Sequence, residues 1–209
     1  MLRKIHDVQA LPYILPFFQS DAPELREAAV TTLRYLNQVD RCPLVFDLLI
    51  DPEVTVRREV VLTLGYLADE GVIAHLSQAL TTDADWQVRR NVAKSLAIHA
   101  SPDALPTLTT ALQDEHWQVR KFALQAVQKT PSNELLTELV QLLADEFSDV
   151  RKEAAIALGT LTTPAALHAL HQALDDPDRE VSIQAERAIK KIQGAITPEN
   201  LAFIARRNE

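Results

Sequence analysis

The sequence is poor in several residue types, and each shortage narrows the range of folds. Only four of its 209 residues are glycine, and aromatic residues make up 5% of the chain. Alanine, leucine, valine, glutamine, glutamate and arginine are abundant instead, which favours helices over sheets. The single cysteine, Cys42, can form no internal disulfide and has no partner for a thiolate metal cluster. We expect it to behave as a small, buried or half-buried hydrophobic side chain.

Long apolar runs and excess positive charge are also missing. No apolar run reaches 18 residues, and no apolar stretch follows the basic residues of the first six positions, so we predict neither a membrane span nor a signal peptide and expect a cytoplasmic protein. The formal net charge of −8 argues against a nucleic-acid partner, because binding to a phosphate backbone depends on lysine and arginine.

Motifs of the common enzyme classes are absent as well. The sequence has no glycine-rich phosphate loop, no Gly-x-Ser-x-Gly elbow and no His-Glu-x-x-His zinc helix, so we assign no catalytic residue. His168 and His171 are three residues apart, but no third ligand lies near them in the sequence. We therefore predict no metal site and no resident cofactor.

What the sequence does contain is a twelve-residue phrase that recurs every 31 or 32 residues. Its first, fifth and ninth positions are apolar, which is the spacing of one stripe along an α-helix. The six copies are LREAAVTTLRYL from Leu25, VRREVVLTLGYL from Val56, VRRNVAKSLAIH from Val88, VRKFALQAVQKT from Val119, VRKEAAIALGTL from Val150 and VSIQAERAIKKI from Val181.

A second apolar segment precedes each copy, so each repeat is predicted to hold a first helix and a second helix. Prolines at or near the starts of four first helices agree with this prediction, because the N–H groups of the first helical turn have no partner within the helix and proline loses no hydrogen bond there. The predicted first helices are residues 9–19, 43–50, 72–81, 103–113, 133–144 and 164–174, with Pro12, Pro43, Pro102 and Pro164 near four of the starts.

An acidic turn joins the two helices of every repeat. We predict its aspartates to be N-caps or first-turn acids of the second helix. They are Asp21, Asp51, Asp83, Asp114, Asp145 and Asp176.

Four of these aspartates stand six residues before an arginine. In a stack of repeats, such an arginine can bridge the acidic turns of its own repeat and of the next one, so we predict a structural ladder. Its members are Asp51 with Arg57, Asp83 with Arg89, Asp114 with Arg120 and Asp145 with Arg151.

These patterns predict an all-α fold of the α-α superhelix type, a single solenoid domain over residues 1–209. A last short helix that starts at Thr197-Pro198 is expected to cap it. The approximate repeats are 9–39, 40–70, 71–101, 102–131, 132–162 and 163–194, with the cap in 195–209.

The phrase Val-Arg-x-x-Ala-x-x-Ala-Leu-Gly, clearest from Val150 to Gly159, resembles the short HEAT-like repeat of the cyanobacterial phycobilin lyase family of the E/F type. The resemblance covers residues 9–194. It implies a HEAT-like repeat solenoid whose relatives attach bilins to phycobiliprotein cysteines, often as heterodimers, or help to dismantle the phycobilisome. The Tyr-x-x-Ala-Trp-Trp run of E-type subunits is absent, and Cys42 follows Arg41 instead of the histidine of the isomerising lyases.

Basic and aromatic side chains recur at matched positions of the second helices, whereas the predicted first helices contain no lysine or arginine. In a two-helix solenoid the second helices line the inner surface, so we predict a partner-binding surface there. Its residues are Arg58, Arg90, Lys94, Lys121, Lys152, Tyr35, Tyr66, Trp86 and Trp117. The basic residues are either solvated helix faces, partly neutralised by Glu59 and Glu153, or a surface for carboxylates. The tryptophans either cover the turns of adjacent repeats or form an aromatic edge for a partner.

Three functions fit this sequence. The first is a non-enzymatic scaffold that binds a protein, with a phycobiliprotein or a second HEAT-like subunit as partner. The second is a subunit of a phycocyanobilin lyase, which would hold a bilin as a transient ligand. The third is an adaptor in an unrelated assembly such as a metallocluster pathway, which would bind protein and no pigment.

Overall fold

The computed structural model describes residues 8–67, 69 and 71–195. Within these ranges helices are the only regular elements, and twelve α-helices follow one another with short 3-10 segments between many of them. The predicted all-α class and the alternation of first and second helices are therefore confirmed. The expected cap helix from Thr197 onward and the N-terminal residues 2–5 lie outside the described residues.

The chain forms two compact units, Met1–Ala111 and Leu112–Glu209. Helices α1 to α7 belong to unit 1 and helices α8 to α12 to unit 2. The single solenoid domain over 1–209 stays a prediction.

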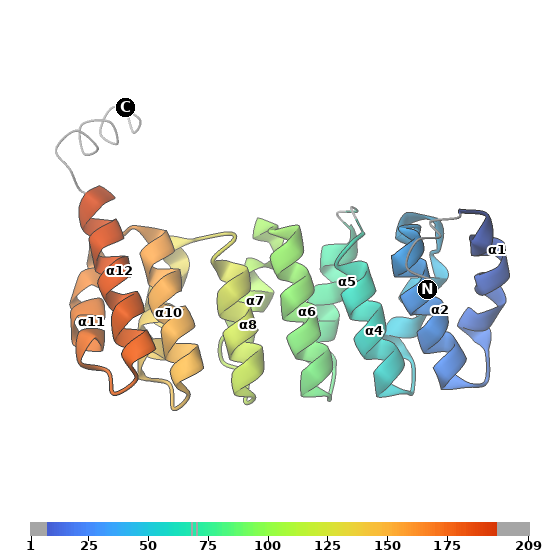
Figure 1. The fold of residues 1–209 in the computed structure, drawn as a ribbon, viewed down its shortest axis with the longest axis horizontal. Coiled ribbons are helices and arrows are strands. Elements are labelled where there is room, and N and C mark those ends of the chain that lie inside the picture. Colours follow the sequence, from blue (N-terminus) through green and yellow to red (C-terminus); the bar gives the residue numbers. More distant parts are fainter. Residues whose placement is uncertain (1–7, 68, 70, 196–209) are drawn as a thin grey trace. The chain divides into compact units, whose positions relative to one another are not determined.

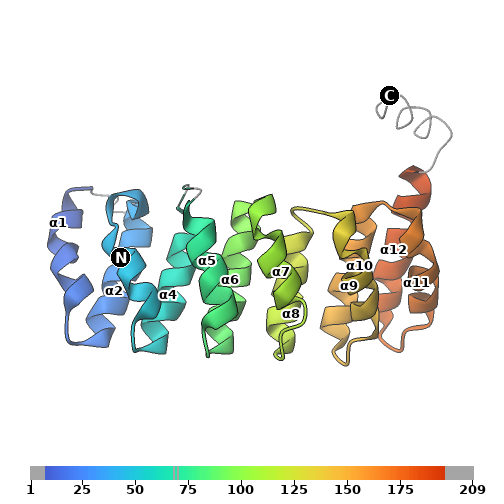
Figure 2. The same cartoon turned by 180° about the vertical axis from the view of Figure 1, so that it is seen from behind.

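Unit 1 has two helical layers. Its second helices are α2 (Pro23–Leu36), α4 (Val54–Leu64) and α6 (Trp86–His99), which lie side by side in Figure 1. Its first helices, seen from behind in Figure 2, are α1 (Leu11–Ile14), α3 (Leu44–Asp47), α5 (Gly71–Thr82) and α7 (Leu105–Ala111).

Unit 2 repeats this arrangement. Its second helices are α8 (Trp117–Val127), α10 (Ser148–Leu161) and α12 (Arg179–Ala195), which contact one another in sequence order. The first helices α9 (Leu136–Gln141) and α11 (Leu167–Gln172) form the other layer, which faces the viewer in Figure 2.

Most first helices are short because 3-10 turns replace part of the α-helix. Pro102 and Pro164 each begin a 3-10 turn, where the missing N–H of proline breaks no hydrogen bond. The 3-10 segments are Val8–Ala10, Leu15–Gln19, Val39–Arg41, Leu48–Ile50, Pro102–Ala104, Asn133–Leu135, Leu142–Ala144, Pro164–Ala166 and Ala173–Asp175.

The predicted apolar stripe forms the core of both units. The ninth position of the phrase is buried in all six copies, at Leu33, Leu64, Leu96, Val127, Leu158 and Ile189. The first position is fully buried from Val56 onward, but Leu25 in the first repeat is 44% exposed, so the stripe prediction is wrong at that residue. Cys42 is buried, and burial raises the pKa of its thiol, which makes it a poor nucleophile at neutral pH.

Candidate functional site

The aspartates of the acidic turns lie before the N-cap residues of the second helices, and not at the N-cap or in the first helical turn as the sequence predicted. The aspartates are not N-caps: Asp51, for example, precedes the N-cap residue Glu53 by two positions, and its Oδ1 accepts the N–H of Glu53 at 2.8 Å. The same bond forms at Asp83, Asp114, Asp145 and Asp176. Each of these five aspartates therefore forms an Asx turn, which leads the chain into the second helix that follows.

Asp21 does not take this role in the first repeat. The hydroxyl of Ser20 accepts the N–H of Ala22, the N-cap residue of α2, so the serine stands in register with the aspartates of the other repeats. The equivalent residue of this turn is therefore Ser20, which a pattern of aspartates alone does not identify.

The arginines of the second helices connect neighbouring turns. Arg57 donates to the carbonyl of Asp51 in its own turn at 2.8 Å and, through Nε and Nη2, to both carboxylate oxygens of Asp83 in the next turn at 2.7 and 3.1 Å. Arg120 and Arg151 repeat this geometry with Asp145 and Asp176. These two-point bonds fix the spacing between consecutive repeats within a unit.

Two members of this arginine–aspartate ladder were missed in the sequence. Arg26 donates to both oxygens of Asp51 at 2.6 and 2.8 Å, and Asp176 accepts from Arg151. The six-residue spacing does not identify them, because the residue six positions before Arg26 is Ser20 and the residue six positions after Asp176 is Ser182.

The ladder residue Arg89 is 8% exposed and donates to the carbonyls of Asp83 and Ala84.

At Arg151, Asp176 and Asp51 the ladder contacts shift the pKa of the side chain. The bond to Asp176 raises the pKa of Arg151, and the bond from Arg151 lowers the pKa of Asp176. For Asp51, burial acts to raise the pKa, but the hydrogen bonds from Arg26 and from the N–H of Glu53 outweigh it and lower the pKa. All three groups are therefore charged at neutral pH, as a structural ion pair requires.

The basic residues of unit 1 come together between α4 and α6. Arg58 donates to both oxygens of Asp85 at 3.0 and 2.8 Å, and Asp85 also caps α6 by accepting the N–H groups of Gln87 and Val88. Arg58 is thus largely neutralised, by Asp85 and not by Glu59, which instead pairs with Arg34 at 2.7 Å.

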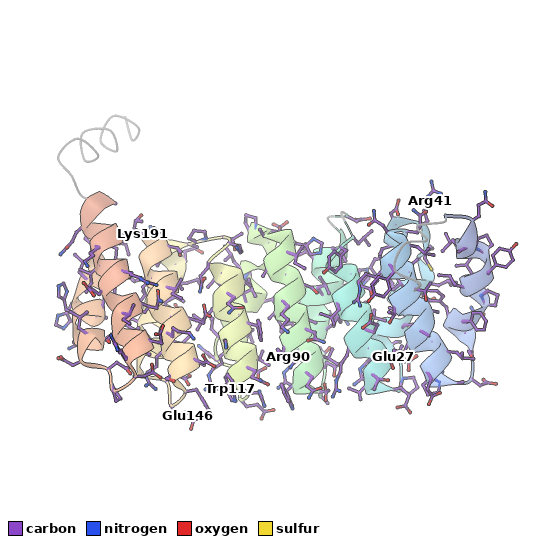
Figure 3. All side chains as sticks on the ribbon, viewed as in Figure 1. Glu27, Arg41, Arg90, Trp117, Glu146 and Lys191 are labelled. Atoms are coloured by element: carbon purple, nitrogen blue, oxygen red, sulfur yellow. The ribbon has the colours of Figure 1, made fainter. Side chains whose placement is uncertain are left out.

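Arg90 and Lys94 on α6 complete this basic cluster. The guanidinium of Arg90 lies 5.3 Å from the ring centroid of Trp86 and donates to the side-chain oxygen of Asn91. Burial, followed by repulsion from Arg58, lowers the pKa of Arg90; burial and repulsion from Arg90 lower the pKa of Lys94. An anionic ligand at this place would offset the repulsion between like charges. Figure 3 labels Arg90 on the side of unit 1 where α2, α4 and α6 lie.

Large apolar side chains are exposed along the same layer. Tyr35 near the end of α2 is 58% exposed and Tyr66 just after α4 is 60% exposed. Ile98 on α6 occupies the same position of the phrase and is 55% exposed, but it was not predicted because isoleucine does not continue the aromatic pattern of the two tyrosines. These three residues and the cluster of Arg58, Arg90 and Lys94 form the unit 1 face.

The predicted residues of unit 2 surround a shared carboxylate. Asp149 accepts from Lys121 at 3.1 Å and from Lys152 at 3.0 Å, and both contacts lower its pKa, that of Lys152 first. The ring of Trp117 stacks on Phe147 at 5.1 Å with the ammonium of Lys121 5.8 Å from its centroid. Here the tryptophan packs over the turn of the adjacent repeat, which was one of the two interpretations of its position.

The carboxylate of Glu153 is hydrogen-bonded by glutamines and acts on Lys152 only through its charge. It is 8% exposed and accepts from the amides of Gln125 and Gln128 at 2.7 and 2.9 Å. Its position therefore fixes α8 against α10.

Other ligand chemistry finds little support in the described part of the chain. No group of three histidine, cysteine or carboxylate side chains is arranged to hold a metal ion there, and His168 and His171 are exposed. None of the described helices has both the length and the apolar character that a bilayer crossing requires.

The structure is similar to several solved repeat proteins. An engineered protein matches with a TM-score of 0.69 and 21% identity over 88% of this chain and 96% of that one. The complex of CpcE and CpcF of phycocyanin lyase from Nostoc sp. PCC7120 matches with a TM-score of 0.65 and 18% identity over 93% and 92% of the two chains. A designed armadillo repeat protein in complex with the peptide (KR)4 matches with a TM-score of 0.66 and 22% identity over 87% and 99%. At these identities the likeness concerns the fold.

A comparison with curated proteins finds no significant match. The family model of HEAT repeats, by contrast, matches residues 11–97, 42–128, 73–148, 107–190 and 136–207, and thus nearly the whole chain. The resemblance seen in the recurring phrase is confirmed at the level of the repeat, and this chain belongs to the HEAT-repeat family.

Proposed function

We propose that this chain is a non-enzymatic scaffold that binds a protein partner through the exposed faces of its second helices. The observation that carries the proposal is the unit 1 face, where Tyr35, Tyr66 and Ile98 are exposed on the layer of second helices that also holds Arg90 and Lys94. Tyrosine and arginine are among the residues that dominate protein interfaces.

The partner we propose is a phycobiliprotein. The support is the resemblance of the repeat phrase to phycobilin lyases and the similarity in fold to the CpcE and CpcF complex of phycocyanin lyase. A lyase subunit is the second candidate, because arginine can bind the carboxylates of a bilin in two-point contacts. The scaffold takes precedence because the exposed apolar side chains of this face suit a protein surface, and the thiol of Cys42 is buried.

The two candidates differ in their response to a bilin. The purified chain is mixed with apo-phycocyanin, with phycocyanobilin, and with both, and followed by size-exclusion chromatography, visible absorption and zinc fluorescence on denaturing gels. A scaffold is expected to co-elute with apo-phycocyanin, to leave the bilin spectrum unchanged, and to add no covalent product over the chain-free reaction. A spectral shift with chain-dependent covalent addition would establish the lyase subunit instead.

A further inference from the structure

The unit 1 face includes a hollow at the end of α4 and α6 that none of the functions above uses. Its volume is about 590 Å³, and it is lined by Tyr66 and Ile98 together with Ile73 and His99. Tyr66 and Ile98 are both more than half exposed although they are large and apolar. Such side chains at the edge of an open hollow gain free energy when an apolar group covers them.

Positive charge begins one helical turn away from the hollow. Lys94 precedes Ile98 by four residues on α6, and Arg90 precedes Lys94 by another four, so the three side chains follow one another along one side of the helix. The hollow is also lined by two acidic residues, Asp69 and Asp103, which follow the C-terminal ends of α4 and α6 in the chain. Along α6 the face therefore changes from basic to apolar, and acidic residues follow beyond the end of the helix.

The spacing of these groups fits an extended chain. One helical turn of four residues advances about 6 Å, and two residues of an extended chain advance about 6.6 Å. Every second side chain of an extended segment points the same way. A segment lying along α6 can thus place one side chain in the hollow and its second and fourth neighbours over Lys94 and Arg90.

We infer that the unit 1 face binds an extended acidic segment of a partner protein, with one apolar side chain between Tyr66 and Ile98 and two carboxylates over Lys94 and Arg90. This inference rests on the proposed scaffold function and adds the chemistry of the bound segment. Asp69 and Asp103 decide on which side of the apolar residue the acidic part of the segment lies. Carboxylates of the segment close to these two aspartates would be repelled, so the acidic part lies toward Lys94.

The inference is tested by fluorescence anisotropy with the full chain and two labelled peptides. The first is fluorescein-Gly-Ser-Asp-Ser-Glu-Ser-Leu-Ser-Gly, and the second has the reverse order, since either chain direction satisfies the spacing. One of them is expected to bind saturably. Replacing its leucine by serine, or both acids by lysine, is expected to weaken binding at least about tenfold, equivalent to about 1.4 kcal/mol.

Matched variants of the chain locate the site. Ile98→Asp is expected to weaken the affinity for the bound peptide at least about tenfold, because it places a carboxylate where the leucine packs. Ile50→Asp makes the same change at a residue that is 86% exposed outside the unit 1 face, and it should leave the affinity unchanged. Circular dichroism of each variant checks that the helices are intact.

Either of two results would overturn the inference. They are the absence of saturable binding by both peptides, and equal affinity of the wild type and Ile98→Asp for the bound peptide. If neither peptide binds but phycocyanobilin does, and Ile98→Asp abolishes that binding, the hollow is a bilin site instead. If apo-phycocyanin still co-elutes with the chain in any of these cases, the scaffold function stands and only the bound segment has been misassigned. If apo-phycocyanin does not bind either, both proposals fail.

Discussion

Asp51→Ala is expected to lower the free energy of unfolding by about 2–4 kcal/mol. Asp51 is 5% exposed and accepts three hydrogen bonds, two from Arg26 and one from the N–H of Glu53. Removing the carboxylate opens the Asx turn before α4 and leaves the Arg26 side chain, which is 11% exposed, without its charge partner. Urea unfolding followed by circular dichroism measures the change.

Two further substitutions separate the charge from the turn. Asp51→Asn keeps an acceptor for the N–H of Glu53 but loses the ion pair, so its effect should lie between the wild type and alanine. Asp47→Ala removes an exposed carboxylate from the preceding helix and should change the free energy by less than about 0.5 kcal/mol. An Asp51→Ala effect as small as that of Asp47→Ala would contradict the structural role of the ladder.

Gly159→Ala is expected to destabilise unit 2 by about 1–3 kcal/mol, although alanine is the better helix former. A Cβ at Gly159 would lie 2.9 Å from Cβ and 3.0 Å from Cα of Ala188, so the backbones of α10 and α12 would have to separate. The glycine is required here because it lets the two helices approach closely.

Gly194 provides the matched control for this substitution. It also lies in a helix, α12, but an added Cβ would meet no atom within 4 Å. Gly194→Ala is therefore expected to be neutral or to stabilise by up to about 1 kcal/mol. Thermal and urea unfolding give the sign of the change in the free energy of unfolding for both variants. A stabilising effect of Gly159→Ala would contradict the close approach of α10 and α12 at this residue.

The repeat architecture could be predicted because its signal is written six times. Apolar residues at positions one, five and nine of the phrase recur in each copy, and their burial drives each second helix into the core. Repetition also compensates for local exceptions such as Leu25, which is exposed. The helix boundaries were harder to place, since the second helices begin two residues before the phrase does.

The candidate surface was only partly predictable. The sequence left two interpretations of Arg58, Lys121 and Lys152, either partly neutralised helix faces or a surface for carboxylates, and in the structure Asp85 and Asp149 bind them. These acids were overlooked because one is an N-cap residue and the other lies in the first turn of its helix, so they do not form one column in the sequence. Which basic residues are neutralised depends on side-chain positions that the repeat pattern does not specify.

The role of the ladder illustrates the opposite case. The spacing of six residues between aspartate and arginine follows from the geometry of one turn and one helix start, so the sequence pointed to most of its members. Arg26 and Asp176 stand at the two ends of the ladder, where serine takes the place of the partner six residues away, and they belong to it through contacts with a neighbouring repeat.

The most direct test of a partner-binding unit 1 face is the affinity for apo-phycocyanin, measured by isothermal titration calorimetry with the wild type, Arg90→Glu and Arg41→Glu. Arg41 is an exposed arginine of the same unit at the end of a 3-10 turn, so its reversal controls for net charge. We predict that Arg90→Glu weakens binding at least about tenfold while Arg41→Glu matches the wild type. No binding by the wild type, or equal affinity of all three proteins, would contradict the account.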